Sequence, residues 1–96
     1  MKLKDLLEDV CLTQKGNKIA EVDVESVKID SRQVEKGDVF IALAGENFDG
    51  NDYIDMALKN GASAVVTDKG ISGEKIIRVE NARSAYAIIS KNFFGK

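Results

Sequence analysis

The sequence predicts a single small α/β domain, spanning residues 1–96, in which helices cover a mixed β-sheet. The chain has 96 residues, 44% of them hydrophobic and 31% charged, which is enough for one hydrophobic core. Aliphatic residues dominate over four Phe, two Tyr and no Trp, which favours a sheet packed under helices. Segments with helical periodicity also alternate with segments that have the two-residue periodicity of strands.

The first part of the chain predicts one helix and then strands. The helix has an apolar stripe at positions i, i+3, i+4 and i+7, made of Leu3, Leu6, Leu7 and Val10. We expect it to end near Thr13. Apolar and polar residues alternate over residues 19–24, as in a half-buried strand, and residues 27–29 continue or restart that pattern.

The middle and the end of the chain follow with clearer boundaries. Residues 39–44 form an apolar run typical of a buried central strand, and the Gly- and Asp-containing loop 45–50 follows it. A helix over residues 51–60, ended by a glycine, and a strand over 62–67 complete a unit whose connection is long enough for parallel pairing. Residues 75–79 predict a further strand. Asn81 then caps a final helix whose inward side contains Ala85, Ile88, Ile89 and Phe93.

The composition excludes several classes of function. The net charge is −2 with both signs interspersed, so no basic stripe is available for a nucleic-acid backbone. The absence of His and the presence of one Cys argue against a zinc site and a Ser-His-Asp triad. Nothing resembles a signal peptide or a membrane span, so we expect a cytoplasmic protein without a membrane or an obligate protein partner. Cys11 is interpreted as a small packing residue.

The polar segment Asp30-Ser31-Arg32, just after the strand at 27–29, is the first candidate site. A carboxylate, a hydroxyl and a guanidinium together could bind a polar ligand. Taken alone, a turn is the more economical interpretation: Asp30 and Ser31 would cap local N–H groups, and Arg32 would pair with a carboxylate such as Asp30 or Asp38.

The loop GENFDG at residues 45–50 is the second candidate site. It joins the end of a central strand to a helix N-terminus, a place where α/β proteins often bind anions. An ordinary connection with Asp49 as the helix cap is equally compatible with the pattern. The loop is neither a Walker A nor a G-x-G-x-x-G motif. The spacing of Asp49, Asp52 and Asp55 suits capping and the helix dipole better than a metal site.

Four blocks in order give a resemblance to a known family. The blocks are IDSR at 29–32, KGDVFIAL at 36–43, GENFDG at 45–50 and ALKNGASAVV at 57–66. Together they resemble the N-terminal domain of the Mur ligases, which use ATP to add amino acids or dipeptides to the UDP-N-acetylmuramoyl precursor of peptidoglycan. MKLKDLL at the start and ISKNFFG at 89–95 are most similar to the branch that adds L-lysine or meso-diaminopimelate to UDP-N-acetylmuramoyl-L-alanyl-D-glutamate.

The resemblance implies a role in binding and not in catalysis. By its analogy, uridine and diphosphate contacts fall on Ile29, Ser31, Glu46, Asn47 and Phe48. The Glu46 side chain is expected to point to solvent, because a carboxylate repels a diphosphate. ATP and Mg²⁺ would bind to domains beyond residues 1–96, and this domain alone would be inactive.

Two alternatives remain open. The chain could be the first domain of the sister ligase that adds D-alanyl-D-alanine, or a small α/β module that binds a protein and performs no chemistry. The amino acid added and the oligomeric state are not encoded in these motifs.

Overall fold

The computed structural model, which describes residues 1–12, 22–71 and 73–95, confirms an α/β fold with a four-stranded sheet. The strands lie in the order β1-β2-β3-β4, and each pairs parallel with its neighbour. The prediction of a mixed sheet is therefore wrong for these strands, because periodicity does not report strand direction. In the described residues, antiparallel pairing is confined to isolated bridges such as Leu12 with Val79.

The strands are shorter than the apolar runs that predicted them. Their bounds are Val27–Lys28 for β1, Val39–Ile41 for β2, Ala64–Thr67 for β3 and Ile76–Arg78 for β4. The run after residue 38 was predicted to continue to residue 44, but the ladder of β2 ends at Ile41 and the chain turns into the next loop. Of the strand predicted over 19–24, residues 19–21 lie outside the described residues. Asp23 in its remainder forms an isolated bridge with Lys2.

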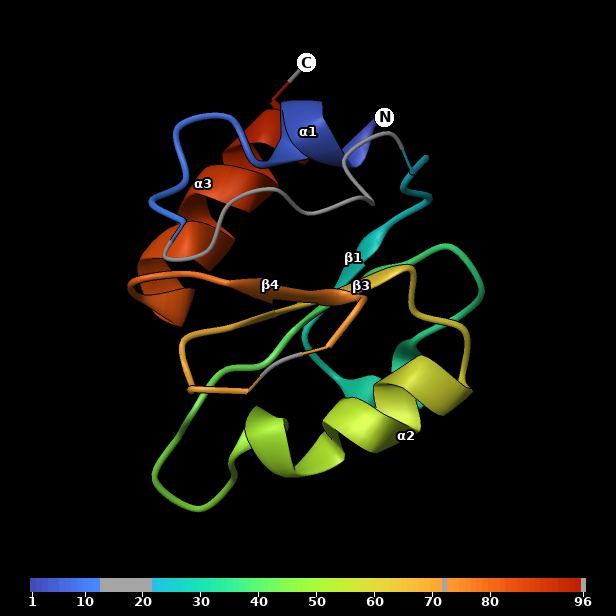
Figure 1. The fold of residues 1–96 in the computed structure, drawn as a ribbon, viewed down its shortest axis with the longest axis vertical. Coiled ribbons are helices and arrows are strands. Elements are labelled where there is room, and N and C mark those ends of the chain that lie inside the picture. Colours follow the sequence, from blue (N-terminus) through green and yellow to red (C-terminus); the bar gives the residue numbers. More distant parts are fainter. Residues whose placement is uncertain (13–21, 72, 96) are drawn as a thin grey trace.

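Both faces of the sheet are covered by helices. α1 (Leu3–Leu6) and α3 (Ala82–Phe94) pack on one face, and α2 (Ile54–Lys59) packs on the other (Figure 1). Successive side chains of β2 therefore enter different cores: Val39 and Ile41 face α1 and α3, whereas Phe40 faces α2. Burial on both faces explains why β2 is apolar throughout and not alternating.

The helices differ most from the prediction at the N-terminus. α1 ends at Leu6, far before Thr13, because the chain turns at Leu7 and Asp9 adopts a φ of 69°. Thr13 itself lies outside the described residues. The predicted 51–60 helix divides into a 3-10 turn, η2 (Gly50–Tyr53), followed by α2. A second 3-10 turn, η1 (Ser31–Gln33), follows β1. The Asn81 cap of α3 is confirmed, since its side chain accepts the amide of Ser84 at 2.9 Å.

Gly61 ends α2 in a conformation that suits only glycine. Its φ is 108°, and a Cβ there would lie 2.8 Å from the Cα of Lys36. The amide of Gly37 donates to the carbonyl of Gly61 at 3.0 Å. The end of α2 is thereby held against the segment that precedes β2.

Lys28, in β1, and Asp38, the residue just before β2, form an ion pair. The Lys28 Nζ lies 2.8 Å from the Asp38 Oδ2, and the Asp38 side chain is only 3% exposed. The same oxygen accepts the amide of Glu35 at 2.9 Å. This pair therefore ties β1 to the turn that leads into β2.

We expect Lys28→Met to lower the free energy of unfolding by about 2 kcal/mol, because it leaves a buried carboxylate without its cation. Urea denaturation would measure this change. Lys2→Met is the matched control, since Lys2 pairs at 3.3 Å with Asp23, whose side chain is 72% exposed; its cost should be below about 1 kcal/mol. Equal effects of the two substitutions would contradict the importance of the buried pair.

Candidate functional site

The two candidate segments leave the sheet at the same edge, the one formed by the carboxyl ends of its parallel strands. β1 and β2 are adjacent and parallel, with Val27 opposite Val39 and Lys28 opposite Phe40. Ile29 to Arg32 therefore follows the carboxyl end of one strand, and loop 45–50 follows the carboxyl end of its neighbour (Figure 1). Ligands of α/β sheets commonly bind at this edge.

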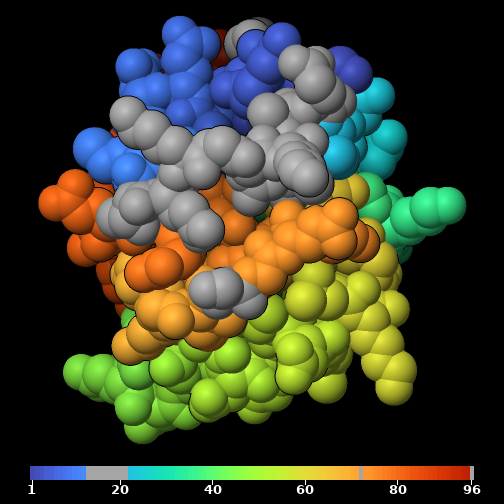
Figure 2. Space-filling model, viewed as in Figure 1, coloured from blue at the N-terminus to red at the C-terminus, as the bar shows by residue number. Residues whose placement is uncertain are grey.

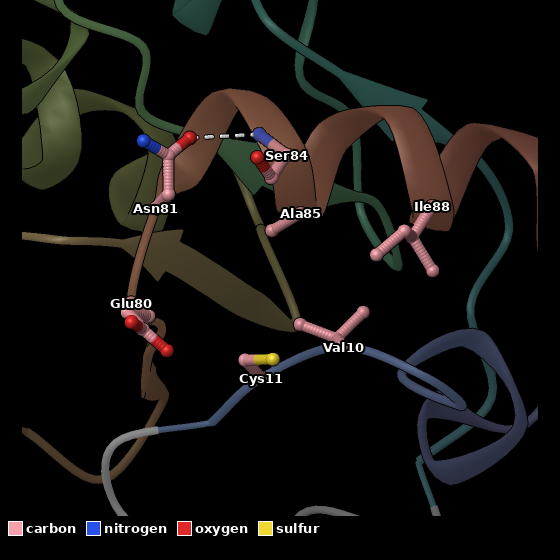
Figure 3. A pocket seen from close by; sticks show the side chains of 7 residues that line it. All are labelled: Val10, Cys11, Glu80, Asn81, Ser84, Ala85 and Ile88. Carbon is pink, nitrogen blue, oxygen red and sulfur yellow. Dashed lines mark hydrogen bonds between the residues drawn. The ribbon is translucent and has the colours of Figure 1, made fainter.

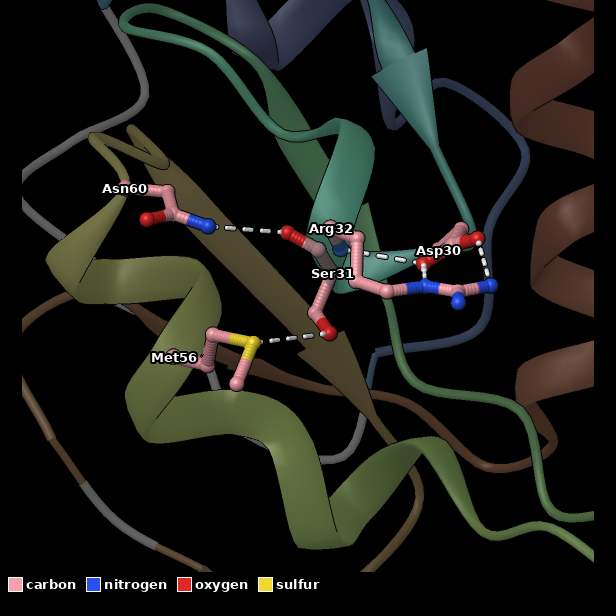
Figure 4. A network of polar contacts seen from close by, with 5 residues as sticks. All are labelled: Asp30, Ser31, Arg32, Met56 and Asn60. Atoms are coloured by element: carbon pink, nitrogen blue, oxygen red, sulfur yellow. Dashed lines mark hydrogen bonds and ion pairs between the residues drawn. The ribbon is translucent and has the colours of Figure 1, made fainter.

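Asp30 and Arg32 use each other to form the turn after β1. The Asp30 carboxylate accepts the amide of Arg32 at 2.9 Å and also its Nε and Nη2 at 3.1 and 2.9 Å (Figure 4). The Arg32 side chain thereby lowers the pKa of Asp30, and its backbone amide lowers that pKa further. The side-chain hydrogen bonds to Asp30, and the negative charge of that carboxylate, raise the pKa of Arg32. The turn interpretation made from the sequence is confirmed for these two residues.

Ser31 is more enclosed than its predicted role suggests. The residue is 2% exposed, and its Oγ donates to the Sδ of Met56 at 3.5 Å (Figure 4). Asn60 donates its side-chain amide to the Ser31 carbonyl at 3.0 Å. A thioether is a weak acceptor, so this bond is easily exchanged for one to an anion. Met56 would have to move aside for that exchange.

Loop 45–50 is a tight turn closed at both ends. Ala44 and Asp49 form an antiparallel bridge, and the amide of Gly45 donates to the carbonyl of Phe48 at 2.6 Å. The amide of Gly50 donates to the carbonyl of Leu43 at 2.8 Å. Among the described residues, no acceptor is found for the amides at positions 46–48. The tip of the loop thus presents backbone donors that a ligand could occupy.

Exposed apolar side chains surround the same edge. Ile29 is 41% exposed, Phe48 49%, Tyr53 37% and Met56 43%. The rings of Phe48 and Tyr53 stack with their centroids 5.0 Å apart and an interplanar angle of 11°. In Figure 2 the loop and helix that follow β2 (green to yellow-green) form one end of the molecule, opposite the end formed by α1 (blue).

The five predicted contact residues are brought to one edge, but the two segments do not bond directly within the described residues. Glu46 and Asn47 are exposed at the loop tip, as expected for Glu46. The link between the segments runs through η2 and α2, since Met56 contacts Ser31 and Tyr53 stacks on Phe48. The sequence interpretation missed Met56, because a methionine on a helix looks like an ordinary packing residue.

Asp49 caps η2, as the sequence predicted. Its Oδ1 accepts the backbone amide of Asn51 at 2.9 Å and the Asn51 side-chain amide at 2.8 Å. The Asn51 side-chain oxygen in turn accepts the hydroxyl of Thr67, at the end of β3. Asp49 is therefore occupied in joining the loop to the sheet. In the described part of the chain, no cluster of three or more His, Cys, Asp or Glu residues is arranged for a metal ion.

A separate hollow of about 210 Å³ lies between the start of α3 and the segment after α1 (Figure 3). Val10, Cys11, Asn81, Ala85 and Ile88 contribute to its lining. The interpretation of Cys11 as a packing residue is wrong, since α1 ends before it and its thiol is exposed. Among the described helices, none has the length and apolar character needed to cross a bilayer.

Comparison with known proteins identifies the family. The family described as "Mur ligase family, catalytic domain" matches residues 23–94. The chain belongs to the Mur ligase family. It is 45% identical to the UDP-N-acetylmuramoyl-L-alanyl-D-glutamate--2,6-diaminopimelate ligase of Caldanaerobacter subterraneus, covering 98% of this chain and 20% of the relative. It is 36% identical to the ligase of the same name from Clostridium tetani, covering 99% of this chain and 21% of the relative.

Solved structures of Mur ligases share this fold. A MurF ligase from Thermotoga maritima, in complex with ADP, is 35% identical with a TM-score of 0.64, over 77% of this chain and 17% of that one. MurF from Acinetobacter baumannii has a TM-score of 0.78 at 23% identity, over 95% of this chain and 20% of that one, which shows a common fold. This Mur ligase chain thus spans about a fifth of the length of the curated relatives it matches.

Protonation of Asp49 is expected to loosen the end of the loop. The backbone amide of Asn51, followed by its side-chain amide, holds the pKa of Asp49 below the ordinary value of an aspartate, so the folded state favours the carboxylate. The resulting stabilisation is present above the unfolded pKa and is lost as the pH falls through the lower folded value. In an NMR titration, the Asp49 carboxyl carbon and the Asn51 amide should respond together, with a midpoint lower than that of an ordinary aspartate.

Asp49→Asn is the matched control for this titration. Asparagine keeps a side-chain oxygen that can cap the turn but has no acidic proton. The Asn51 amide should then stop responding to acid. A midpoint for Asp49 that is not lower than that of an ordinary aspartate would contradict the assigned cap.

Proposed function

We propose that this chain is the N-terminal, substrate-binding domain of a Mur ligase that adds the third residue of the peptidoglycan stem peptide. Its task is to hold the UDP end of UDP-N-acetylmuramoyl-L-alanyl-D-glutamate. The observation that carries this proposal is the pair of segments at one sheet edge, with unoccupied backbone donors in loop 45–50. The family membership and the names of the relatives support the choice of substrate.

The proposed binding mode uses backbone donors and few charged groups. The amides of Glu46, Asn47 and Phe48 donate to diphosphate oxygens or uracil carbonyls, and Ser31 Oγ donates to a phosphate oxygen once Met56 releases it. Backbone donors bind an anion without a basic surface, which fits a chain of net charge −2.

The apolar side chains at this edge suit the uracil ring. Phe48 offers one exposed ring face, and Tyr53 stacks on it and holds it in place. Asn47 is exposed and has both a donor and an acceptor, which match the amide-like edge of uracil. Ile29, in the segment after β1, adds exposed apolar area at the same edge. A nucleoside diphosphate combines an anion with a flat polar ring, and both features match this edge.

The domain would contribute positioning and no catalytic group. In the proposed whole enzyme, ATP with Mg²⁺ transfers its γ-phosphoryl group to the D-glutamate carboxylate, and the incoming amine then displaces phosphate to form the amide. ATP and Mg²⁺ would bind beyond residues 1–96. Holding the nucleotide end limits where the reacting carboxylate can lie, which lowers the entropic cost of the reaction.

A second candidate is the first domain of the ligase that adds D-alanyl-D-alanine. The 35% identity to MurF from Thermotoga maritima favours it, although that match covers less of this chain than the matches to the diaminopimelate ligases do. Both candidates share the proposed UDP site. Assays of the full-length ligase with diaminopimelate, L-lysine and D-alanyl-D-alanine as the incoming substrate would separate the two candidates. Activity with D-alanyl-D-alanine and with neither amino acid would overturn the first candidate.

Titration of the chain with UDP, followed by amide NMR, tests the proposed site. We expect the signals of Ser31 and of residues 46–48 to shift at roughly millimolar UDP, since an isolated domain binds only one part of the substrate. Ser31→Ala should weaken binding about tenfold by removing one hydrogen bond to a charged group.

Ser26→Ala is the matched control, because Ser26 lies before β1, at the opposite end of the strand from Ser31. It should leave UDP binding unchanged. Shifts confined to other regions, or no shift with either UDP or the complete UDP-N-acetylmuramoyl-dipeptide, would overturn the proposed function.

A further inference from the structure

Arg83, in the first turn of α3, reaches across to the loop of the proposed site. Its Nη2 donates to the carbonyl oxygen of Ala44 at 2.8 Å. Ala44 is the residue that begins the closed turn, since it forms the bridge with Asp49. A charged donor makes a stronger hydrogen bond than a neutral one. The bond therefore joins the helix on one face of the sheet to the base of the loop.

The helix turn that contains Arg83 is itself tied to the sheet. The amide of Ala82 donates to the Asp68 carboxylate at 2.9 Å, and Asp68 directly follows β3. The Asn81 cap holds the same turn of α3 through the amide of Ser84. The position of Arg83 is thus set by the end of β3, the strand next to β2.

The far end of the loop has an independent anchor. Asn51 bonds both to Asp49 and to Thr67, the last residue of β3. Gly50 packs against the backbone of residues 42–43, which follow β2. A Cβ added at Gly50 would lie 2.9 Å from the Leu43 amide nitrogen. On the way into the loop, the amide of Ala42 donates to the carbonyl of Val66 in β3 at 2.9 Å. At Ala44 itself, the side-chain tie found among the described residues is the one from Arg83.

From this geometry we infer that Arg83 is a positioning residue that orders loop 45–48 for its ligand. By bonding the Ala44 carbonyl, it fixes the direction in which the following amides point and places a cation beside the proposed anion site. A loop that is already ordered loses less entropy on binding. This inference rests on the proposed function, because the ligand that benefits is the nucleoside diphosphate.

The test compares Arg83→Met, Arg83→Lys and the control Lys91→Met in the 96-residue chain. Lys91 is an exposed cation on the same helix, so its removal reproduces the change in net charge but not the loss of the bond. Far-UV circular dichroism confirms that each variant folds. Two quantities are then measured: the backbone order of residues 45–48 by ¹⁵N relaxation, and the dissociation constant for UDP.

We expect Arg83→Met to increase the motion of residues 45–48 and to weaken UDP binding about tenfold, as expected for one charged hydrogen bond. Arg83→Lys should recover part of both effects, because it keeps a charged donor but not the planar guanidinium. Lys91→Met should change neither. Unchanged loop order and unchanged affinity in Arg83→Met would overturn the inference.

The two proposals fail in different ways. If the unsubstituted chain binds neither UDP nor the complete UDP-N-acetylmuramoyl-dipeptide, the proposed function fails, and the relaxation measurement still reports whether Arg83 orders the loop. If the unsubstituted chain binds UDP while Arg83→Met and Lys91→Met lose affinity equally, Arg83 acts only through its charge, and the positioning role is rejected.

Discussion

The parallel pairing of β1 with β2 is the constraint on which the candidate site depends. Because the two strands run the same way, the segments that follow them emerge at one edge, although ten or more residues separate them in the sequence. The register is held by packing on both faces, since a slip of one residue would move Phe40 from the α2 core into the α1 and α3 core. The ion pair of Lys28 with Asp38 adds a polar tie between β1 and the approach to β2.

Local hydrogen bonding then decides which polar groups at this edge remain available. Asp30 bonds to Arg32, and Asp49 bonds to Asn51, so both carboxylates are neutralised or engaged in forming turns. The Ala44–Asp49 bridge closes the loop, and the amides of residues 46–48 find no acceptor among the described residues. A site built from such donors can attract an anion without a concentration of basic side chains, whose mutual repulsion would destabilise a small domain.

The exposed apolar residues give the edge its second property. Single exposed apolar residues are ordinary on protein surfaces, but here Ile29, Phe48, Tyr53 and Met56 lie around the same pair of segments. Met56 and Tyr53 also connect those segments, one through Ser31 and the other through a ring stack. The helix that covers one face of the sheet thus also organises its edge.

The sequence by itself determined the features that depend on near neighbours in the chain: the α/β class, the apolar β2, the caps at Asp49 and Asn81, and the glycine that ends α2. It also identified the two polar segments. Strand direction was beyond it, since periodicity reports which face is buried and not which way a strand runs. The early end of α1 escaped it because the apolar spacing continues to Val10 after the helix stops. Only the tertiary structure placed Met56 over Ser31 and Arg83 on Ala44, because these contacts join residues 25 and 39 positions apart and no local pattern encodes them.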